Sequence, residues 1–306
     1  MKRYNIGIVG VTGFTGHELV KILYRHPSVN LVYGTTTSAM GKQIGELYPD
    51  LAFVDLVLSE YSITSVRSHK LDIAFLAVHH GMAMQYAGEL LKAGVRVIDL
   101  SADFRFSSFE TYEKVYGSHS DKALCKQAVY GLPERCRPEI KEARLVANPG
   151  CYVTSALLAL LPLKDVVSDI IIDAKSGVSG AGKKLDEMYL FANLHNNFKA
   201  YGIAIHRHQP EIEAYLGQPI EFVPHLLPIN RGILSTIYIR SKCSLEDLRE
   251  KLTQAYEDEP FVSVLTKGSP EISMVAGTNH CYLSVHKASR PGMFILVSAL
   301  DNLIKG

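Results

Sequence analysis

Short apolar runs alternate with amphipathic stretches over the first half of the chain. The first run ends at Gly10, and the first amphipathic stretch stops before Pro27, a residue that seldom continues a helix. The pattern predicts, in chain order, a strand at residues 4–10, a helix at 14–25, strands at 31–35 and 72–78, a helix at 82–92 and a strand at 95–100. Strands that alternate with helices in this way predict an α/β fold with a doubly wound parallel sheet.

The pattern changes after about residue 148, where strands begin to follow one another without helices between them. The expected elements are a helix at residues 152–161, strands at 169–175, 220–223 and 233–240, a helix at 245–256, and strands at 281–286 and 293–298. This order predicts an α+β domain with a mixed or antiparallel sheet and helices on one face. We therefore expect two domains, at residues 1–148 and 149–299.

Composition favours small-molecule ligands. Hydrophobic residues make up 47% of the 306 residues and charged residues 21%, and the formal net charge is +1. A balanced charge gives no reason to expect a nucleic acid or a membrane surface as partner.

The start of the chain leaves no room for a signal peptide, and the apolar stretch at residues 157–163 is too short to span a bilayer. Five irregularly spaced cysteines fit reduced thiols, so the expected location is the cytoplasm.

Three glycines at intervals of three follow the first expected strand. Gly10 permits a tight turn, Gly13 lets a pyrophosphate approach the backbone, and Gly16 lets the helix pack closely on the sheet. A glycine-rich turn without a ligand is the competing interpretation, but the position between strand and helix favours a Rossmann-type dinucleotide site. The residues expected to contact the cofactor there are Gly10, Thr12, Gly13, Phe14, Thr15 and Gly16.

The end of the second strand indicates which dinucleotide is bound. An NAD site usually has an acidic residue there to hold the ribose diol, whereas this chain has hydroxyl residues from Thr35 to Ser38, followed by Lys42. Hydroxyls and a lysine suit a 2′-phosphate, which a carboxylate would repel. We therefore expect NADP(H), with Ser38 among its contacts.

A cysteine lies at the start of the first helix of the second domain. Asn148 is a favoured N-cap residue and Pro149 a favoured first helical residue, which places Cys151 in the first turn. The helix dipole stabilises a thiolate there and makes it nucleophilic. A lone cysteine is more often a small buried apolar residue, and that interpretation holds for the other four.

A thiolate beside a nicotinamide cofactor limits the chemistry. It can attack an activated acyl carbon and form a thioester, which hydride reduces to an aldehyde. His206 and His208 offer imidazoles for proton transfer, although two surface histidines are an equal alternative. Arg105 follows the end of a strand and suits a phosphate clamp, with a surface ion pair as the rival interpretation.

Taken together, these motifs resemble the N-acetyl-gamma-glutamyl-phosphate reductase family, a branch of the aspartate-semialdehyde dehydrogenase superfamily in arginine biosynthesis. The resemblance covers the whole chain in family order. The matching stretches are residues 10–16, 98–105, 130–134, 147–152, 176–182, 206–208, 224–226, 231–234 and 301–306.

The resemblance implies NADPH-dependent reduction of N-acetyl-L-glutamyl 5-phosphate to the 5-semialdehyde plus inorganic phosphate, by a homodimer or homotetramer. It implies that Cys151 is the nucleophile and His206 the acid/base, with His208 close to the substrate. Arg105 and Asn148 would contact the leaving phosphate.

The resemblance also assigns a loop and the C-terminal end. The loop at residues 176–182 would approach the nicotinamide, with Ser176 and Gly177 on the cofactor and Ser179 on the substrate. The C-terminal end, about residues 300–306, would return to the cofactor domain and bring Asn302 to the nicotinamide. No metal is implied.

Three features differ from the family pattern. His79 stands where the family usually has proline, and no arginine lies near Thr37, so NADP preference depends on the hydroxyls and Lys42. The family continues past Gly306 into a helical segment rich in Ala, Gln and Asn.

Two alternatives remain open. One is a sibling reductase acting on aspartyl phosphate or carrier-linked aminoadipyl phosphate; the His206-Arg207-His208 motif argues against the aspartyl enzyme. The other is a non-catalytic NADP-binding regulator, which would need neither Cys151 nor His206.

Overall fold

The computed structural model describes residues 2–183 and 186–306, and its contacts divide the chain into two units, Met1–Pro149 and Gly150–Gly306. Residues 300–306, which we expected to join the first domain, group with the second unit. The reason is hydrogen bonding: the Gly277 N–H donates to the Asp301 carboxylate at 2.6 Å, and the Gly232 N–H donates to Asn302 Oδ1 at 2.7 Å.

The first unit is built on a seven-stranded sheet in which every neighbouring pair is parallel, in the order β3-β2-β1-β4-β5-β7-β6. Its strands are β1 (Tyr4–Val9), β2 (Val29–Thr35), β3 (Leu58–Ser59), β4 (Ile73–Leu76), β5 (Arg96–Asp99), β6 (Val129–Tyr130) and β7 (Leu145–Ala147). Its helices are α1 (Phe14–Tyr24), α2 (Ile44–Leu47), α3 (Ile63–Ser68), α4 (Ala83–Lys92), α5 (Phe109–Tyr116), α6 (Lys122–Cys125) and α7 (Pro133–Glu142), with a 3₁₀ turn at Pro49–Leu51.

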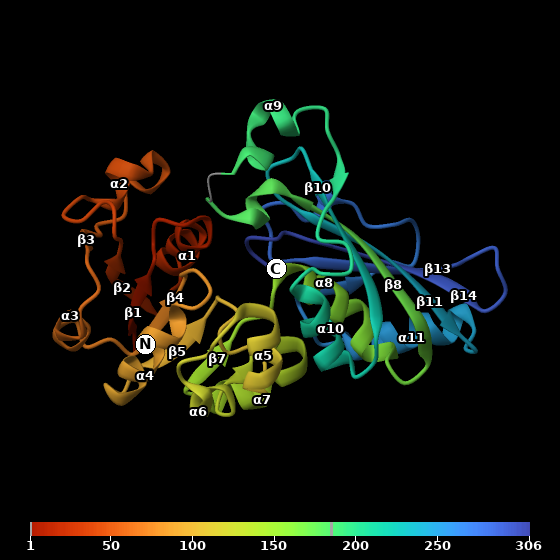
Figure 1. The fold of residues 1–306 in the computed structure, drawn as a ribbon, viewed down its shortest axis with the longest axis horizontal. Coiled ribbons are helices and arrows are strands. Elements are labelled where there is room, and N and C mark those ends of the chain that lie inside the picture. The colour runs from red at the N-terminus through yellow and green to blue at the C-terminus, as the bar shows by residue number, and fades with distance from the viewer. Residues whose placement is uncertain (1, 184–185) are drawn as a thin grey trace. The chain divides into compact units, whose positions relative to one another are not determined.

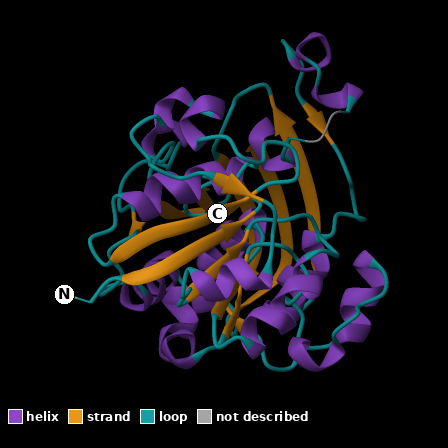
Figure 2. Ribbon diagram, turned by 90° about the vertical axis from the view of Figure 1, so that its left-hand side faces the viewer, coloured by secondary structure: helices purple, strands orange, loops and turns teal. Residues whose placement is uncertain are grey.

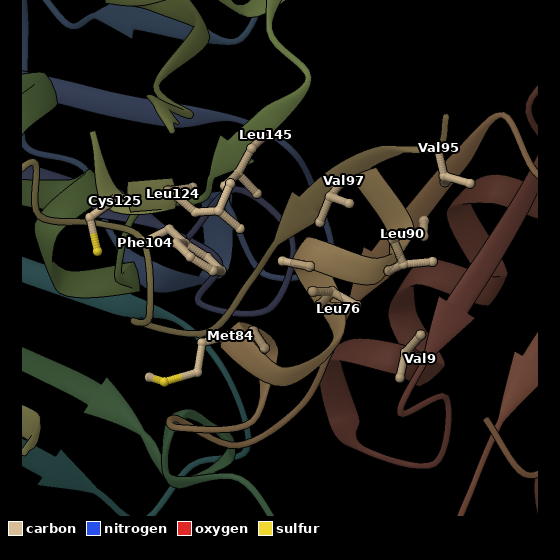
Figure 3. Close-up of a cluster of buried hydrophobic side chains, with 14 of the residues drawn as sticks. Val9, Leu76, Met84, Leu90, Val95, Val97, Phe104, Leu124, Cys125 and Leu145 are labelled. Atoms are coloured by element: carbon tan, nitrogen blue, oxygen red, sulfur yellow. The ribbon is translucent and has the colours of Figure 1, made fainter. Parts of the chain in front are cut away.

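Two separate apolar clusters lie on the two faces of this sheet, as a doubly wound fold requires. Successive residues of β1 point to opposite faces, so Ile8 belongs to the cluster under α1 while Val9 belongs to the other cluster. Figure 3 shows the second cluster, in which Leu90 of α4 packs near Leu76 and Val97 of the sheet. The chain turns one way after β1 and the other way after β4, and the crevice at such a switch point is where open α/β sheets bind ligands.

The second unit contains a seven-stranded mixed sheet in the order β12-β13-β14-β11-β8-β10-β9. Its strands are β8 (Val167–Gly177), β9 (Lys199–Ala200), β10 (Ile220–Leu227), β11 (Ile233–Ser241), β12 (Val262–Val264), β13 (Cys281–Lys287) and β14 (Met293–Leu300). Its helices are α8 (Cys151–Leu160), α9 (Phe191–Leu194), α10 (His208–Leu216) and α11 (Leu245–Ala255), with 3₁₀ turns at Leu161–Leu163, Val178–Ala181, Glu187–Tyr189 and Ile272–Met274. A segment that includes α9 extends beyond the end of the long strands (Figures 1 and 2).

Helix α8 is the central helix of the second unit, and every residue after Cys151 in it is buried. Three hydroxyls join it to the sheet: Ser155 Oγ lies 2.9 Å from Ser235 Oγ on β11 and 3.0 Å from Ser298 Oγ on β14. Small side chains at all three positions let the helix approach the strands closely. The start of α8 is therefore held at a fixed place over the sheet. None of the helices in the described part of the chain is long and apolar enough to cross a membrane.

Candidate active site

In the glycine-rich turn after β1, the fold itself requires Gly10 and Gly16 but not Gly13. Gly10 has φ +88°, and a Cβ there would lie 2.4 Å from the Ala77 carbonyl oxygen. A Cβ on Gly16 would lie 2.5 Å from the Gly10 carbonyl oxygen. At Gly13 the nearest atom to a Cβ is 3.8 Å away, so the protein itself leaves this position open.

The N-terminus of α1 fits a pyrophosphate. Its N-cap residue is Gly13, which has no side chain to cap the helix, and its first turn carries no acidic residue. The positive end of a helix dipole attracts an anion. The open space at Gly13 lets a phosphate approach the start of α1, which is consistent with the expected dinucleotide site.

Two alanine variants distinguish these roles. We expect Gly13→Ala to weaken NADPH binding by about tenfold or more, because its Cβ would meet the pyrophosphate, with unchanged stability. Gly16→Ala should instead lower the free energy of unfolding by about 1–3 kcal/mol, because its Cβ overlaps the backbone. Fluorescence titration with NADPH and urea unfolding measure the two effects. Equal losses of stability in both variants would contradict the assignment.

The hydroxyls after β2 divide into buried and exposed groups. Thr35 Oγ1 accepts the Gly10 N–H at 3.2 Å, and Thr36 Oγ1 accepts the Ser38 N–H at 3.2 Å and lies 3.5 Å from Thr12 Oγ1. Because Thr35 and Thr36 are buried, their hydroxyls hold the turn together. The side chains of Thr37 and Ser38 are exposed, and no carboxylate stands at the end of β2.

The structure brings together the two residues expected to contact phosphate. Arg105 is buried, and its Nε donates to the Asn148 carbonyl oxygen at 2.7 Å while Nη2 donates to the Leu100 carbonyl oxygen at 3.1 Å. The Asn148 N–H donates to the Asp99 carbonyl oxygen at 2.8 Å. Hydrogen bonds thus fix the peptide units on both sides of Asn148, a residue that precedes Cys151 by three positions in the chain.

Two buried carboxylates that the sequence analysis did not single out shape the loop after β5. Burial raises the pKa of Asp99 to about 7, and both of its oxygens accept hydrogen bonds from Ser101. The Asp103 carboxylate accepts from the Gly81 N–H at 2.7 Å and from the Tyr112 hydroxyl at 3.0 Å. These bonds fix the loop that carries Arg105.

Cys151 is the first residue of α8, and its N-cap residue is Gly150. The expectation that Asn148 caps the helix is wrong, because the backbone of Asn148 is bound by the loop after β5 and its side-chain Nδ2 donates to the Pro149 carbonyl oxygen. Cys151 still lies in the first turn, where the helix dipole favours a thiolate.

Helix α10 places two side chains against the start of α8. A Cβ on Gly150 would lie 2.4 Å from His208 Nε2, so the imidazole packs directly on this glycine. Glu211, fully buried, accepts the Gly150 N–H on Oε1 at 3.1 Å. His208 and Glu211 are three residues apart and therefore share a face of α10. That spacing was the available sequence signal for Glu211, which sequence reasoning missed.

His206 lies in an aromatic enclosure next to His208. Its ring centroid is 5.7 Å from that of Tyr152, 5.5 Å from Tyr201 and 4.8 Å from His208. Burial and, to a lesser degree, the charge of Arg207 lower the pKa of His206 to about 4. The ring is therefore neutral near neutral pH.

The loop after β8 and the C-terminal end meet beside Cys151. Asn302 Nδ2 donates to Ser179 Oγ at 3.0 Å, and a Cβ on Gly180 would lie 3.0 Å from Ser176 Oγ and 3.6 Å from Asn302 Nδ2. A Cβ on Gly306 would lie 2.8 Å from the Cys151 Cβ, a proximity that no local sequence signal reveals. The expected site residues Ser176, Ser179 and Asn302 thus form one cluster.

Gly177 has a structural role beside that cluster. A Cβ there would lie 2.7 Å from the Arg231 backbone nitrogen and from the Asn230 carbonyl oxygen. Only glycine allows this close approach of two backbone segments.

Comparison with known proteins agrees with this architecture. Residues 5–143 match the family model described as semialdehyde dehydrogenase, NAD binding domain, and residues 151–302 match semialdehyde dehydrogenase, dimerisation domain. The solved aspartate semialdehyde dehydrogenase II of Vibrio cholerae, complexed with ASA, covers 100% of this chain and 95% of its own at a TM-score of 0.75 and 16% identity. The enzyme of Candida albicans, solved with NADP, covers 99% of this chain and 95% of its own at a TM-score of 0.73 and 14% identity.

Curated relatives are much more similar in sequence. The N-acetyl-gamma-glutamyl-phosphate reductase of Pelotomaculum thermopropionicum is 48% identical over 98% of this chain and 91% of its own length. That of Laribacter hongkongensis is 45% identical with the same coverage. The chain therefore belongs to the semialdehyde dehydrogenase family and, within it, to the N-acetyl-gamma-glutamyl-phosphate reductases.

Proposed function

We propose that the protein reduces N-acetyl-L-glutamyl 5-phosphate to N-acetyl-L-glutamate 5-semialdehyde and phosphate, as a step of arginine biosynthesis. The supporting observation is the position of Cys151 as the first residue of α8, with His208 packed on the preceding glycine. A thiol at a helix N-terminus beside an imidazole is equipped for nucleophilic attack. The names of the curated relatives supply the substrate.

In the proposed mechanism the Cys151 sulfur attacks the acyl carbon, and the bond from that carbon to the phosphate oxygen breaks. A thioester remains on Cys151, and Arg105 and Asn148 are proposed to bind the departing phosphate. Ser179 and His208 are proposed to contact the substrate. NADPH, when bound, supplies the hydride for the thioester carbon. Expulsion of the thiolate then releases the aldehyde and restores Cys151.

The cofactor is proposed to be NADP(H), held by the turn from Gly10 to Gly16 and by the exposed hydroxyl of Ser38. The absence of a carboxylate at the end of β2 supports NADP over NAD. On the nicotinamide side we propose contacts from the loop after β8 and from the C-terminal end, through Ser176, Gly177 and Asn302.

We further propose that the sheet of the second unit pairs with a second copy of the chain. The face that carries Ser235 is covered by α8, while the opposite face presents a row of half-exposed apolar side chains. Ile171, Tyr238 and Ile295 are direct neighbours in that row across β8, β11 and β14. An apolar sheet face of this kind is typical of a subunit interface, and sedimentation of the purified protein tests whether it forms a homodimer or homotetramer.

The reverse reaction tests substrate, cofactor and chemistry together. We expect NADPH to form when the protein is mixed with N-acetylglutamate semialdehyde, phosphate and NADP, with much slower formation of NADH from NAD. No reaction is expected when phosphate is omitted, since phosphate cleaves the thioester in this direction. Activity with aspartate semialdehyde alone would identify a sibling reductase, and NADP binding without turnover of either aldehyde would support the regulator.

A further inference from the structure

The hydrogen bonding of His206 defines which of its ring nitrogens carries the proton. The His208 backbone N–H donates to His206 Nδ1 at 3.1 Å. A backbone N–H can only donate, so Nδ1 must accept and is unprotonated. The neutral ring therefore carries its proton on Nε2.

The surroundings of the His206 ring disfavour protonation of Nδ1. His208 is the first residue of α10, so the Nδ1 atom of His206 faces the positive end of that helix. The groups around the ring are Tyr152, Tyr201, Phe222, His208 and the charged Arg207. Within residues 2–183 and 186–306, these contacts include no carboxylate, and burial followed by the Arg207 charge lowers the pKa of His206 to about 4.

The Nε2–H of His206 is available to a ligand. Among residues 2–183 and 186–306, no side chain or backbone group bonds to Nε2. His206 is half-buried, and its Nε2 atom is not fully enclosed, so a ligand can reach it. A neutral imidazole that presents a fixed N–H stabilises developing negative charge without giving up its proton.

We infer that His206 is a hydrogen-bond donor to the oxyanion formed on the acyl carbon, and that proton transfer belongs to His208. This inference rests on the proposed function, because the oxyanion arises only when the acyl group is attacked. His208 packs on Gly150, directly before Cys151. In acylation the thiol proton of Cys151 passes to His208 and then to the departing phosphate oxygen. The oxyanion forms again when the thioester is reduced, and its collapse expels the Cys151 thiolate. His206 keeps its Nε2 proton throughout.

The protonation state can be measured without turnover. Nitrogen NMR of protein labelled with ¹⁵N-histidine, with the His206 signals assigned by their loss in His206→Gln, reports the tautomer. We expect Nε2–H and an unprotonated Nδ1, with no titration between about pH 5.5 and 9. A proton on Nδ1, or a midpoint near the ordinary histidine value, would overturn the inference even if the protein proves to be inactive in the assay.

Two isosteric variants test the catalytic role. The amide of His206→Gln lies near the original Nε2 and can donate, whereas His206→Asn can cap α10 near Nδ1 but lacks the distal donor. We expect kcat of His206→Asn to fall by about 10²–10³-fold and that of His206→Gln by about tenfold or less. Both should keep the wild-type pH–rate profile, whereas His208→Gln should lose one of its limbs.

Equal loss in both His206 variants, or a missing limb in either profile, would instead make His206 the proton carrier. If the wild-type protein reduces no acyl phosphate, the proposed function fails, and the NMR result still decides the protonation state of His206.

Discussion

Replacing Cys151 by serine should lower turnover by about 10⁴-fold or more, because a serine hydroxyl is a much weaker nucleophile than a cysteine sulfur at a helix start. NADPH binding should remain, since the glycine-rich turn that fits the pyrophosphate belongs to the first unit. The measurements are the steady-state rate and a fluorescence titration with NADPH.

The matched control is Cys243→Ser, which changes another half-buried cysteine of the second unit, outside the site. It should keep the wild-type rate. Mass spectrometry of the wild-type protein incubated with acyl phosphate and no cofactor should find the acyl group on Cys151. Turnover at the normal rate in Cys151→Ser, or an acyl group on a different cysteine, would disprove the thioester mechanism.

The second large effect is expected at Gly150. A Cβ at this position would stand 2.4 Å from His208 Nε2, so in Gly150→Ala the imidazole must move away from the start of α8. Displacing a catalytic group by about 1 Å can cost about 10²-fold in rate, and we expect a loss of kcat of that order. The glycine has φ −68°, which alanine adopts without strain, so the fold should be retained.

Gly88→Ala provides the control for Gly150→Ala. Gly88 lies inside α4, where alanine favours the helix, and the nearest atom to its Cβ would be an Asp121 carboxylate oxygen at 3.3 Å. Its rate should match the wild type. A Gly150→Ala variant with normal kcat and an unchanged pH profile would show that the position of His208 against α8 is not needed for catalysis.

Much of the fold could be predicted from the sequence, because its longer elements carry clear periodic patterns. The first strand, the glycine-rich turn and α1 lie within one residue of their expected ends. Strands β3, β6 and β7 were not predicted, since each has only two or three residues and no pattern can develop over that length. Their place in the sheet depends on pairing with distant strands.

The site shows a similar division between local and distant effects. Cys151 in a first turn could be predicted because helix-start signals are local. The prediction that Asn148 is the N-cap residue was wrong because Arg105, more than forty residues earlier, donates a hydrogen bond to the Asn148 carbonyl oxygen. The approach of Gly306 to Cys151 joins opposite ends of the second unit, and single-sequence patterns carry no information about such contacts.

The three hydroxyls at the contact between α8 and the sheet have a consequence for sequence variation. Ser155, Ser235 and Ser298 come from a helix and two strands, yet they share one small volume. A bulkier side chain at any of them would lift α8 and carry Cys151 with it, although none of the three needs to touch substrate. We therefore expect sequence variation at these positions to be coupled, with a gain in volume at one accompanied by a loss at another. Natural selection on the nucleophile thus extends to residues deep in the interior.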